Sequence, residues 1–295
     1  MNELNPLAVG AVPLGRPPAD GAYGTPSGRR AKDHLLRTLR TIVPAAVGLG
    51  LFAVAWQLLA AHYAARTANA FPSIGAIWSE LSSNLSMYGI DAAHTLEEVT
   101  IGLGVSFITA FTLAIVMTHI PIIERVVMPL AVILNVTPVV AIAPGLTLML
   151  GLGMSPRYVV TALIVFFPLL INSLVGLGNV DLEALDLFQT MHASKTEVLL
   201  HLRLPSSLPF LFVAARICFP LATVGAVVAE FSTSGPDTGL GSAIAVAVAS
   251  DAVPSVYAAI FCLAVMGLAL TLVVTLAERR LLAWHPTSRL TTRER

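Results

Sequence analysis

Charge is the property this chain has least of. Only 12% of its 295 residues are Asp, Glu, Lys or Arg, while 56% are hydrophobic; an average soluble domain has roughly a quarter charged residues. This balance argues against a soluble enzyme and for a chain that lies within lipid. The formal net charge is zero, so no excess of positive charge points to a nucleic-acid partner.

Cysteine and the usual metal and nucleotide motifs are also scarce. Cys218 and Cys262 both stand within apolar runs, which argues against a disulfide framework and favours a packing role. The histidines are scattered, so we expect no metal site. No Gly-x-x-x-x-Gly-Lys-Ser/Thr sequence is present. We therefore expect this chain to bind no cofactor and to have no phosphate-binding loop for ATP.

The chain instead contains several long apolar runs. A bilayer core about 30 Å thick is crossed by about 20 helical residues. Windows of at least roughly this length cover residues 41–61, 98–118, 123–150, 158–176, 208–229 and 256–276. The expected fold class is therefore an all-α polytopic membrane protein with about six transmembrane helices.

The third of these windows is longer than one untilted span and contains Pro138 and Pro144. Proline removes a backbone donor and crowds the preceding turn, so we expect this helix to be kinked or broken. Such a break is either purely structural or lines a solute pathway. Polar residues at membrane depth likewise either form hydrogen bonds between helices or line that pathway. The candidates for pathway lining are Asn135, Thr137, Pro138, Asn172, Ser173 and Glu230.

The ends of the chain differ from its middle. Residues 1–35 are rich in Pro, Gly, Ala and Arg without the apolar core of a signal peptide, so we expect a disordered cytoplasmic N-terminal tail. Residues 36–280 form the expected transmembrane domain, and residues 281–295 a cytoplasmic C-terminal tail. Within the domain, apolar spacings of three and four over residues 73–90 predict a short amphipathic helix at the outer interface, with Trp78 and Tyr88 as anchors.

Positive charge is unevenly distributed around the apolar windows. Arginines cluster in both tails, whereas residues 231–254 contain no Lys or Arg. Because cytoplasmic loops carry an excess of Lys and Arg, we expect both termini in the cytoplasm. Arg66 and Arg157 are then expected on the outer side.

Residues 179–207, named here the polar loop, separate the fourth and fifth windows. Their apolar residues predict a first short helix over residues 182–188 and a turn at residues 191–193. Ser194-Lys-Thr-Glu197 has the spacing of a capping box, which starts a second helix, and we expect Pro205 to stop that helix. Its broad apolar surface needs cover from its own bundle, from lipid headgroups or from a partner protein.

The run Asp186-Leu-Phe-Gln-Thr-Met-His-Ala-Ser-Lys-Thr-Glu-Val-Leu-Leu-His-Leu-Arg-Leu-Pro205 resembles the "EAA" loop of binding-protein-dependent ABC importer permeases. The match is in register at Ala193-Ser194 and Leu204-Pro205. Asp186-Leu-Phe stands in place of the family's Glu-Ala-Ala, and His192 in place of its usual glycine. That glycine allows a left-handed turn, which histidine adopts at some cost. Other segments, such as Phe166-Phe167-Pro168, look like the branch that transports nitrate, sulfonates, taurine and vitamin precursors.

The resemblance implies a type I ABC importer permease fold and a non-catalytic, multi-pass subunit of a bacterial inner membrane. The partners it implies are a pair of cytoplasmic ABC ATPase subunits that hold ATP and Mg, a second permease subunit, with a homodimer expected, and an extracytoplasmic solute-binding protein. The solute it implies is a sulfonate, a nitrate-like anion, or an aromatic heterocycle such as a pyrimidine or riboflavin precursor. The ATPase-coupling residues it implies are Asp186, Met191, His192, Ala193, Ser194, Val198, Leu199, Leu200, Leu202, Leu204 and Pro205.

Two other classes of protein compete with this interpretation. A secondary carrier or channel that does not use ATP would have similar spans, although nothing in such a protein requires the polar loop. A membrane enzyme would need an acid, a base or a nucleophile that converge at membrane depth. The apolar windows offer only Arg216, Glu230 and isolated hydroxyl groups for that purpose.

Overall fold

The computed structural model describes residues 27–63, 71–232 and 238–281. All regular elements in these ranges are helices. Residues 1–55 and 56–295 form two separate units, and the first of them contributes only the N-terminal part of helix α1 to the described residues. The expected tails at residues 1–35 and 281–295 lie largely outside the described ranges, although α1 already begins at Ser27.

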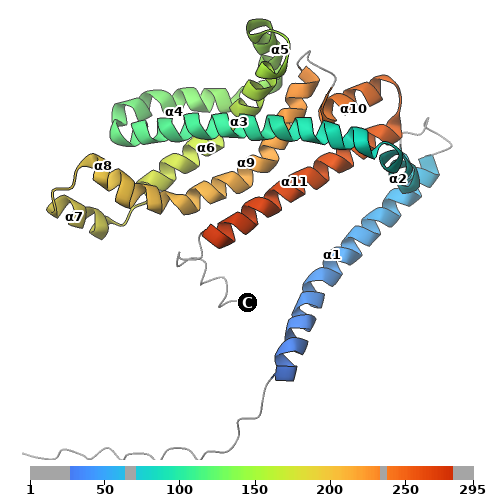
Figure 1. Ribbon diagram of the computed structural model, residues 1–295, viewed down its shortest axis with the longest axis horizontal. Helices are drawn as coiled ribbons and strands as arrows, with labels where there is room; N and C mark the ends of the chain where they lie inside the picture. Colours follow the sequence, from blue (N-terminus) through green and yellow to red (C-terminus); the bar gives the residue numbers. More distant parts are fainter. Residues whose placement is uncertain (1–26, 64–70, 233–237, 282–295) are drawn as a thin grey trace, which may run out of the picture. The chain divides into compact units, whose positions relative to one another are not determined.

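The helices are labelled in Figure 1. Their bounds are α1 Ser27–Tyr63, α2 Ile74–Ser83, α3 Leu85–His119, α4 Pro121–Val136, α5 Val139–Leu150, α6 Met154–Gly178, α7 Leu182–Thr190, α8 Lys195–Val198, a π-helical turn Leu199–Arg203, α9 Leu204–Ser232, α10 Leu240–Ala249 and α11 Val253–Leu281.

Membrane-crossing length is reached by α3, by α6, by the continuous stretch Lys195–Ser232 and by α11. The helices α4 and α5 together are a fifth candidate span, broken by a bend of 100°. The break at Pro138 confirms the prediction for the third window, whereas Pro144 lies inside α5 without breaking it. The first window lies in α1, where the apolar stretch within the described residues, Ala46–His62, is shorter than a full span.

Helix α6 packs most extensively against α3 and α9, and α11 lies beside α9 (Figure 1). Small residues permit this close approach. A methyl group added to Gly102 of α3 would stand 2.7 Å from the side chain of Thr161, and one added to Gly225 of α9 would stand 3.3 Å from the Thr161 backbone. Contacts of this kind let helix backbones approach in lipid, where apolar burial alone gives little drive to associate.

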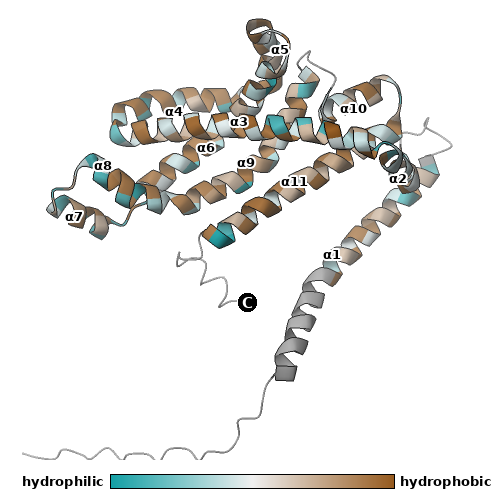
Figure 2. Ribbon diagram, in the orientation of Figure 1, coloured by the Kyte–Doolittle hydropathy of each residue, from teal (hydrophilic) through white to brown (hydrophobic). Residues whose placement is uncertain are grey.

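Hydropathy divides the bundle by position along its helices (Figure 2). The long helices are mostly hydrophobic, and hydrophilic residues gather on α7 and α8 and at the C-terminal end of α11. At that end of α11, Glu278 forms an ion pair with Arg216 of α9. Arg216 therefore has a structural partner, as a charged residue in a membrane helix usually does.

The helix predicted over residues 73–90 is wrong in its extent. Helix α2 ends at Asn84, whose φ of −119° and ψ of 27° are not helical, and α3 starts at the next residue. Tyr88 therefore belongs to a long membrane helix. It is 2% exposed, and its hydroxyl lies 3.3 Å from a carboxylate oxygen of Glu80. It is not a headgroup anchor, whereas Trp78 is 66% exposed, as an anchor requires.

Candidate functional site

The polar loop contains two short helices that are joined by a tight turn. Helix α7 begins after Asp181, whose carboxylate accepts a hydrogen bond from the backbone N–H of Glu183 at 3.0 Å. The chain turns at Met191 and His192, where His192 has a φ of 54°. This is the left-handed conformation expected at that position, and it turns the chain away from the axis of α7.

A capping box starts the second helix, as the sequence predicts. The backbone N–H of Ser194 donates to Glu197 Oε2 at 2.7 Å, and the backbone N–H of Glu197 donates to Ser194 Oγ at 3.3 Å. These reciprocal bonds satisfy two donors that a helix start otherwise leaves unpaired. The start of α8 is therefore fixed directly after the turn.

Pro205 does not stop this helix, contrary to the prediction. The chain continues from α8 through the π-helical turn into α9 without a break. Within the turn the backbone N–H of Leu204 bonds to the carbonyl of Leu199, five residues earlier. Proline has no N–H to contribute, and the change of register just before it accommodates the ring. The loop's second helix and membrane helix α9 are thus one continuous element.

Part of the polar loop is attached to its own bundle. Leu199 and Leu204 pack against the core formed mainly by α3, α6 and α9. Arg203 donates from Nη1 to the carbonyl of Leu177 in α6 at 3.0 Å. These two leucines are among the predicted coupling residues, and in this structure they hold the loop in place.

Another part of the loop is uncovered. Four large apolar side chains are exposed, by 72%, 59%, 72% and 51% respectively: Leu182, Leu187, Met191 and Leu200. Three other predicted coupling residues are exposed: Asp186, His192 and Ser194. Four more are half-buried: Ala193, Val198, Leu202 and Pro205. The structure thus places the predicted residues on one loop and leaves an apolar surface there.

The predicted pathway residues do not gather in one place. Residues 135–138 lie at the break between α4 and α5. Asn172 donates from Nδ2 to the carbonyl of Pro168 in its own helix at 2.8 Å, while Ser173 is buried and its hydroxyl has no hydrogen-bond partner. Glu230 belongs to a different group of polar residues at the far end of α9.

That group, named here the α10 cluster, lies at the end of the bundle opposite the polar loop (Figure 1). It consists of Asp91, Thr95 and Glu98 of α3, Arg157 of α6, Glu230 of α9 and residues 239–242 at the start of α10. Arg157 Nη1 lies 3.1 Å from Glu98 Oε1, and the two side chains are 1% and 0% exposed. Charges at membrane depth are costly unless they are paired, so this ion pair links α3 and α6.

The same cluster holds the start of α10. The backbone N–H of Gly239 donates to Asp91 at 3.2 Å, that of Leu240 to Thr95 at 2.9 Å, and that of Ser242 to Glu230 at 2.9 Å. The first N–H groups of a helix have no partner within it, and they carry a partial positive charge. Side chains from two other helices, two of them carboxylates, therefore cap α10.

Two glycines make this capping possible. Gly239 has a φ of 109°, which side-chain-bearing residues rarely adopt, and a Cβ added there would stand 2.4 Å from a Glu230 oxygen. A Cβ added to Gly241 would stand 2.6 Å from the other oxygen. The carboxylate can reach the helix start because neither residue has a side chain.

Local sequence patterns do not indicate this cluster. They predict only that Arg157 lies on the outer side, and they assign no role to Asp91 or Glu98. A usable signal was present, because α3, α6 and α9 each carry an ionisable residue near the same end, and membrane charges usually pair.

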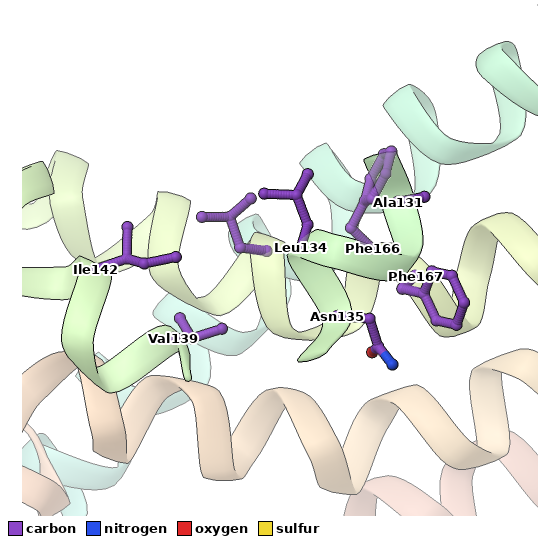
Figure 3. A pocket seen from close by; sticks show the side chains of 8 residues that line it. Ala131, Leu134, Asn135, Val139, Ile142, Phe166 and Phe167 are labelled. Atoms are coloured by element: carbon purple, nitrogen blue, oxygen red, sulfur yellow. The ribbon is translucent and has the colours of Figure 1, made fainter. Parts of the chain in front are cut away.

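A hollow lies where α4, α5 and α6 meet (Figure 3). Asn135 of α4, Val139 of α5 and Phe166 and Phe167 of α6 are among its lining residues, and none of the lining residues is charged. Across the part of the chain that the structure describes, no group of three His, Cys, Asp or Glu residues is arranged to hold a metal ion.

Comparisons with known proteins agree with the architecture. Residues 102–283 match the family described as binding-protein-dependent transport system inner membrane component. The chain is similar to the formylaminopyrimidine transport permease protein ThiX of Halalkalibacterium halodurans, with 34% identity over 206 residues, which are 70% of this chain and 81% of the relative.

Two further relatives cover a similar part of the chain. The riboflavin transport system permease protein RibX of Chloroflexus aurantiacus is 32% identical over 219 residues, which are 72% of this chain and 77% of the relative. The taurine transport system permease protein TauC of Escherichia coli is 25% identical over 193 residues, with 65% and 70% covered. The chain therefore belongs to the family of binding-protein-dependent inner-membrane transport components, the non-catalytic permease subunits of ABC importers with the type I fold.

Proposed function

We propose that this chain is the permease subunit of an ATP-driven importer for a small solute, and that the polar loop is the docking site for a cytoplasmic ATPase subunit. The observation that carries the proposal is the uncovered apolar surface of Leu187, Met191 and Leu200 on an otherwise hydrophilic loop. Exposed apolar surface on a protruding loop favours a protein partner, because burial of that surface is then favourable.

Continuity of the helix supports a mechanical role for the loop. The stretch Lys195–Ser232 has 38 residues, which correspond to a helix about 57 Å long. One end carries Leu200 of the docking surface, and the other carries Glu230, which caps α10. A movement of the polar loop, driven by ATP on the partner, would therefore reach the opposite end of the bundle. Alternating access then follows as the permease changes between two rigid states.

The number of loops sets the number of permease chains. Each chain supplies one polar loop, so two permease chains serve a pair of ATPase subunits, and we propose that these two chains form a homodimer. ATP and Mg are bound by those partners, and an extracytoplasmic protein delivers the solute. The relatives named for formylaminopyrimidine and riboflavin transport favour an aromatic heterocycle over a sulfonate or nitrate-like anion.

The substitution Met191→Glu tests ATPase docking. Met191 is 72% exposed, so the substitution should not disturb folding, but it places a charge on the docking surface. We expect loss of ATPase co-purification and of binding-protein-dependent uptake. Ser250→Glu, an exposed position at the other end of the bundle, is the control and should retain the ATPase. Unchanged co-purification in Met191→Glu would overturn the docking site. Uptake that continues with an inactivated ATPase would indicate a carrier or channel instead.

A further inference from the structure

The break between α4 and α5 leaves backbone groups without hydrogen-bond partners in the described part of the chain. The 16 residues of α4 rise about 24 Å, which is less than the bilayer core of about 30 Å. The chain then bends by 100° at Thr137 and Pro138. The break therefore lies within the hydrocarbon region if α4 crosses from the side of the polar loop.

Among the described residues, two backbone hydrogen bonds close this break, from Thr137 to Ile133 at 3.0 Å and from Ala141 to Pro138 at 2.9 Å. No bond in the described chain uses the carbonyl groups of residues 134–136 or the N–H groups of residues 139 and 140. Lipid cannot satisfy such groups, and irregular backbone is tolerated in a membrane only where it is covered by protein or lines a water-filled cavity.

Asn135 provides a second, independent sign of a polar occupant. Its side chain is exposed and makes no hydrogen bond within the described protein. An amide that faces lipid without a partner costs several kcal/mol on hydrocarbon transfer scales. Figure 3 shows this amide among the side chains that line the hollow. Water, a bound solute or a polar group of a second chain therefore faces Asn135, and the lining of the hollow distinguishes among them.

The remaining lining of the hollow selects the kind of solute. Phe166 and Phe167 supply aromatic surface, and the lining contains no cation that could bind an anion. The three free carbonyl groups would repel an anion, while the two free N–H groups donate. Such a mixture of donors and acceptors beside aromatic rings suits a planar heterocycle whose edge both donates and accepts hydrogen bonds.

We propose that residues 134–140 at the α4–α5 break, with Phe166 and Phe167, form a solute-binding site on the translocation pathway for an uncharged aromatic heterocycle. This inference rests on the proposed transport function and adds the place and chemistry of the site. The heterocycle would lie across the open side of the hollow, with its face on a phenylalanine ring and its edge toward Asn135.

Thiol modification in the assembled transporter tests the site. In a Cys262→Ser background, Asn135→Cys is compared with Ile133→Cys; the native Ile133 side chain is 61% exposed and does not line the hollow. A charged methanethiosulfonate reagent modifies only thiols that are in contact with water. We expect modification at position 135 and none at position 133. We also expect 4-amino-2-methylpyrimidine to slow the modification and taurine to leave it unchanged.

Phe167→Leu provides a second readout that preserves the apolar volume. Loss of one ring stacking contact should raise the pyrimidine concentration needed for half-protection roughly tenfold. Phe107→Leu is the matched control, because Phe107 stacks on Phe111 within α3 and does not line the hollow. It should leave protection unchanged.

Three results would overturn the inference. Absence of modification at position 135, with and without ATP, means that lipid or a second copy of the chain covers Asn135; a disulfide between two copies at that position would identify the second copy. Protection by taurine equal to that by the pyrimidine would exclude a heterocycle site, as would no protection by either. Each of these results leaves the ATPase test on Met191 untouched, so failure of the site and failure of the proposed function are distinguishable.

Discussion

At the scale of single residues, His192 shows how a departure from a family pattern can preserve the backbone. Its φ of 54° is the conformation that the usual glycine of this loop would adopt without strain. A residue with a side chain pays roughly 1–2 kcal/mol for that conformation. The helix before the turn, α7, and the capping box after it at Ser194 therefore hold His192 in this conformation.

His192→Gly should keep the turn and the stability of the protein, because the relief of strain offsets the greater freedom of glycine in the unfolded chain. His192→Val should destabilise the protein by about 1–2 kcal/mol, since a β-branched residue is an outlier at positive φ. Thermal denaturation of the purified protein measures both. Thr190→Val, an exposed position within α7, controls for the added valine. If valine were tolerated at position 192 as well as glycine is, the loop would have to fold differently.

At the scale of elements, the arrangement of the bundle depends on close packing of α3 on α6 and on the register of α9. Gly102 of α3 contacts Thr161 of α6, and the π-helical turn sets the register at the start of α9. Both depend on backbone geometry more than on side-chain chemistry.

Gly102→Ala tests the packing of α3 on α6. The added methyl would stand 2.7 Å from Thr161 and 3.2 Å from the carbonyl of Tyr158, so the helices must separate, at a cost of about 1–3 kcal/mol. Gly104→Ala lies two residues further along α3 with nothing within 4 Å, and it should be neutral or stabilising. The midpoints of thermal denaturation in detergent compare the two variants. Equal midpoints would show that the interface yields without loss of stability.

Proline explains much of what the sequence could and could not predict about these elements. Apolar length located the windows that became α3, α6, α9 and α11, and the break at Pro138 was predictable because proline lacks a donor. The continuation through Pro205 was not, because it depends on a π-helical register set by Leu199 to Arg203. The loop's turn and cap were readable from local spacing. The α10 cluster joins residues up to 148 positions apart, and local patterns do not contain that information.

At the scale of the whole molecule, the permease has a hydrophilic loop at one end of its bundle and a capped short helix at the other. The uneven distribution of arginine predicts which end faces the cytoplasm. We propose that the polar loop and both termini share that side, because the opposite assignment would place the arginine-rich tails outside.

Thiol labelling of intact spheroplasts, from which the cell wall has been removed, checks this orientation. With a membrane-impermeant maleimide, Ser250→Cys at the end of α10 should be labelled directly. Met191→Cys in the polar loop should be labelled only after the membrane is permeabilised. Both side chains are exposed, so access rather than burial decides the result. The reverse pattern would show that the permease is inverted relative to the proposal.

The ion pair between Arg157 and Glu98 also constrains the order of events during synthesis of the chain. The two residues are 59 positions apart, and a ribosome adds roughly 5–20 residues per second. Glu98 is therefore synthesised roughly 3–12 s before its partner. During that interval Glu98 lacks its partner Arg157. Helix α3 must therefore remain at the insertion machinery, or Glu98 must be protonated or stay in water until α6 has been synthesised.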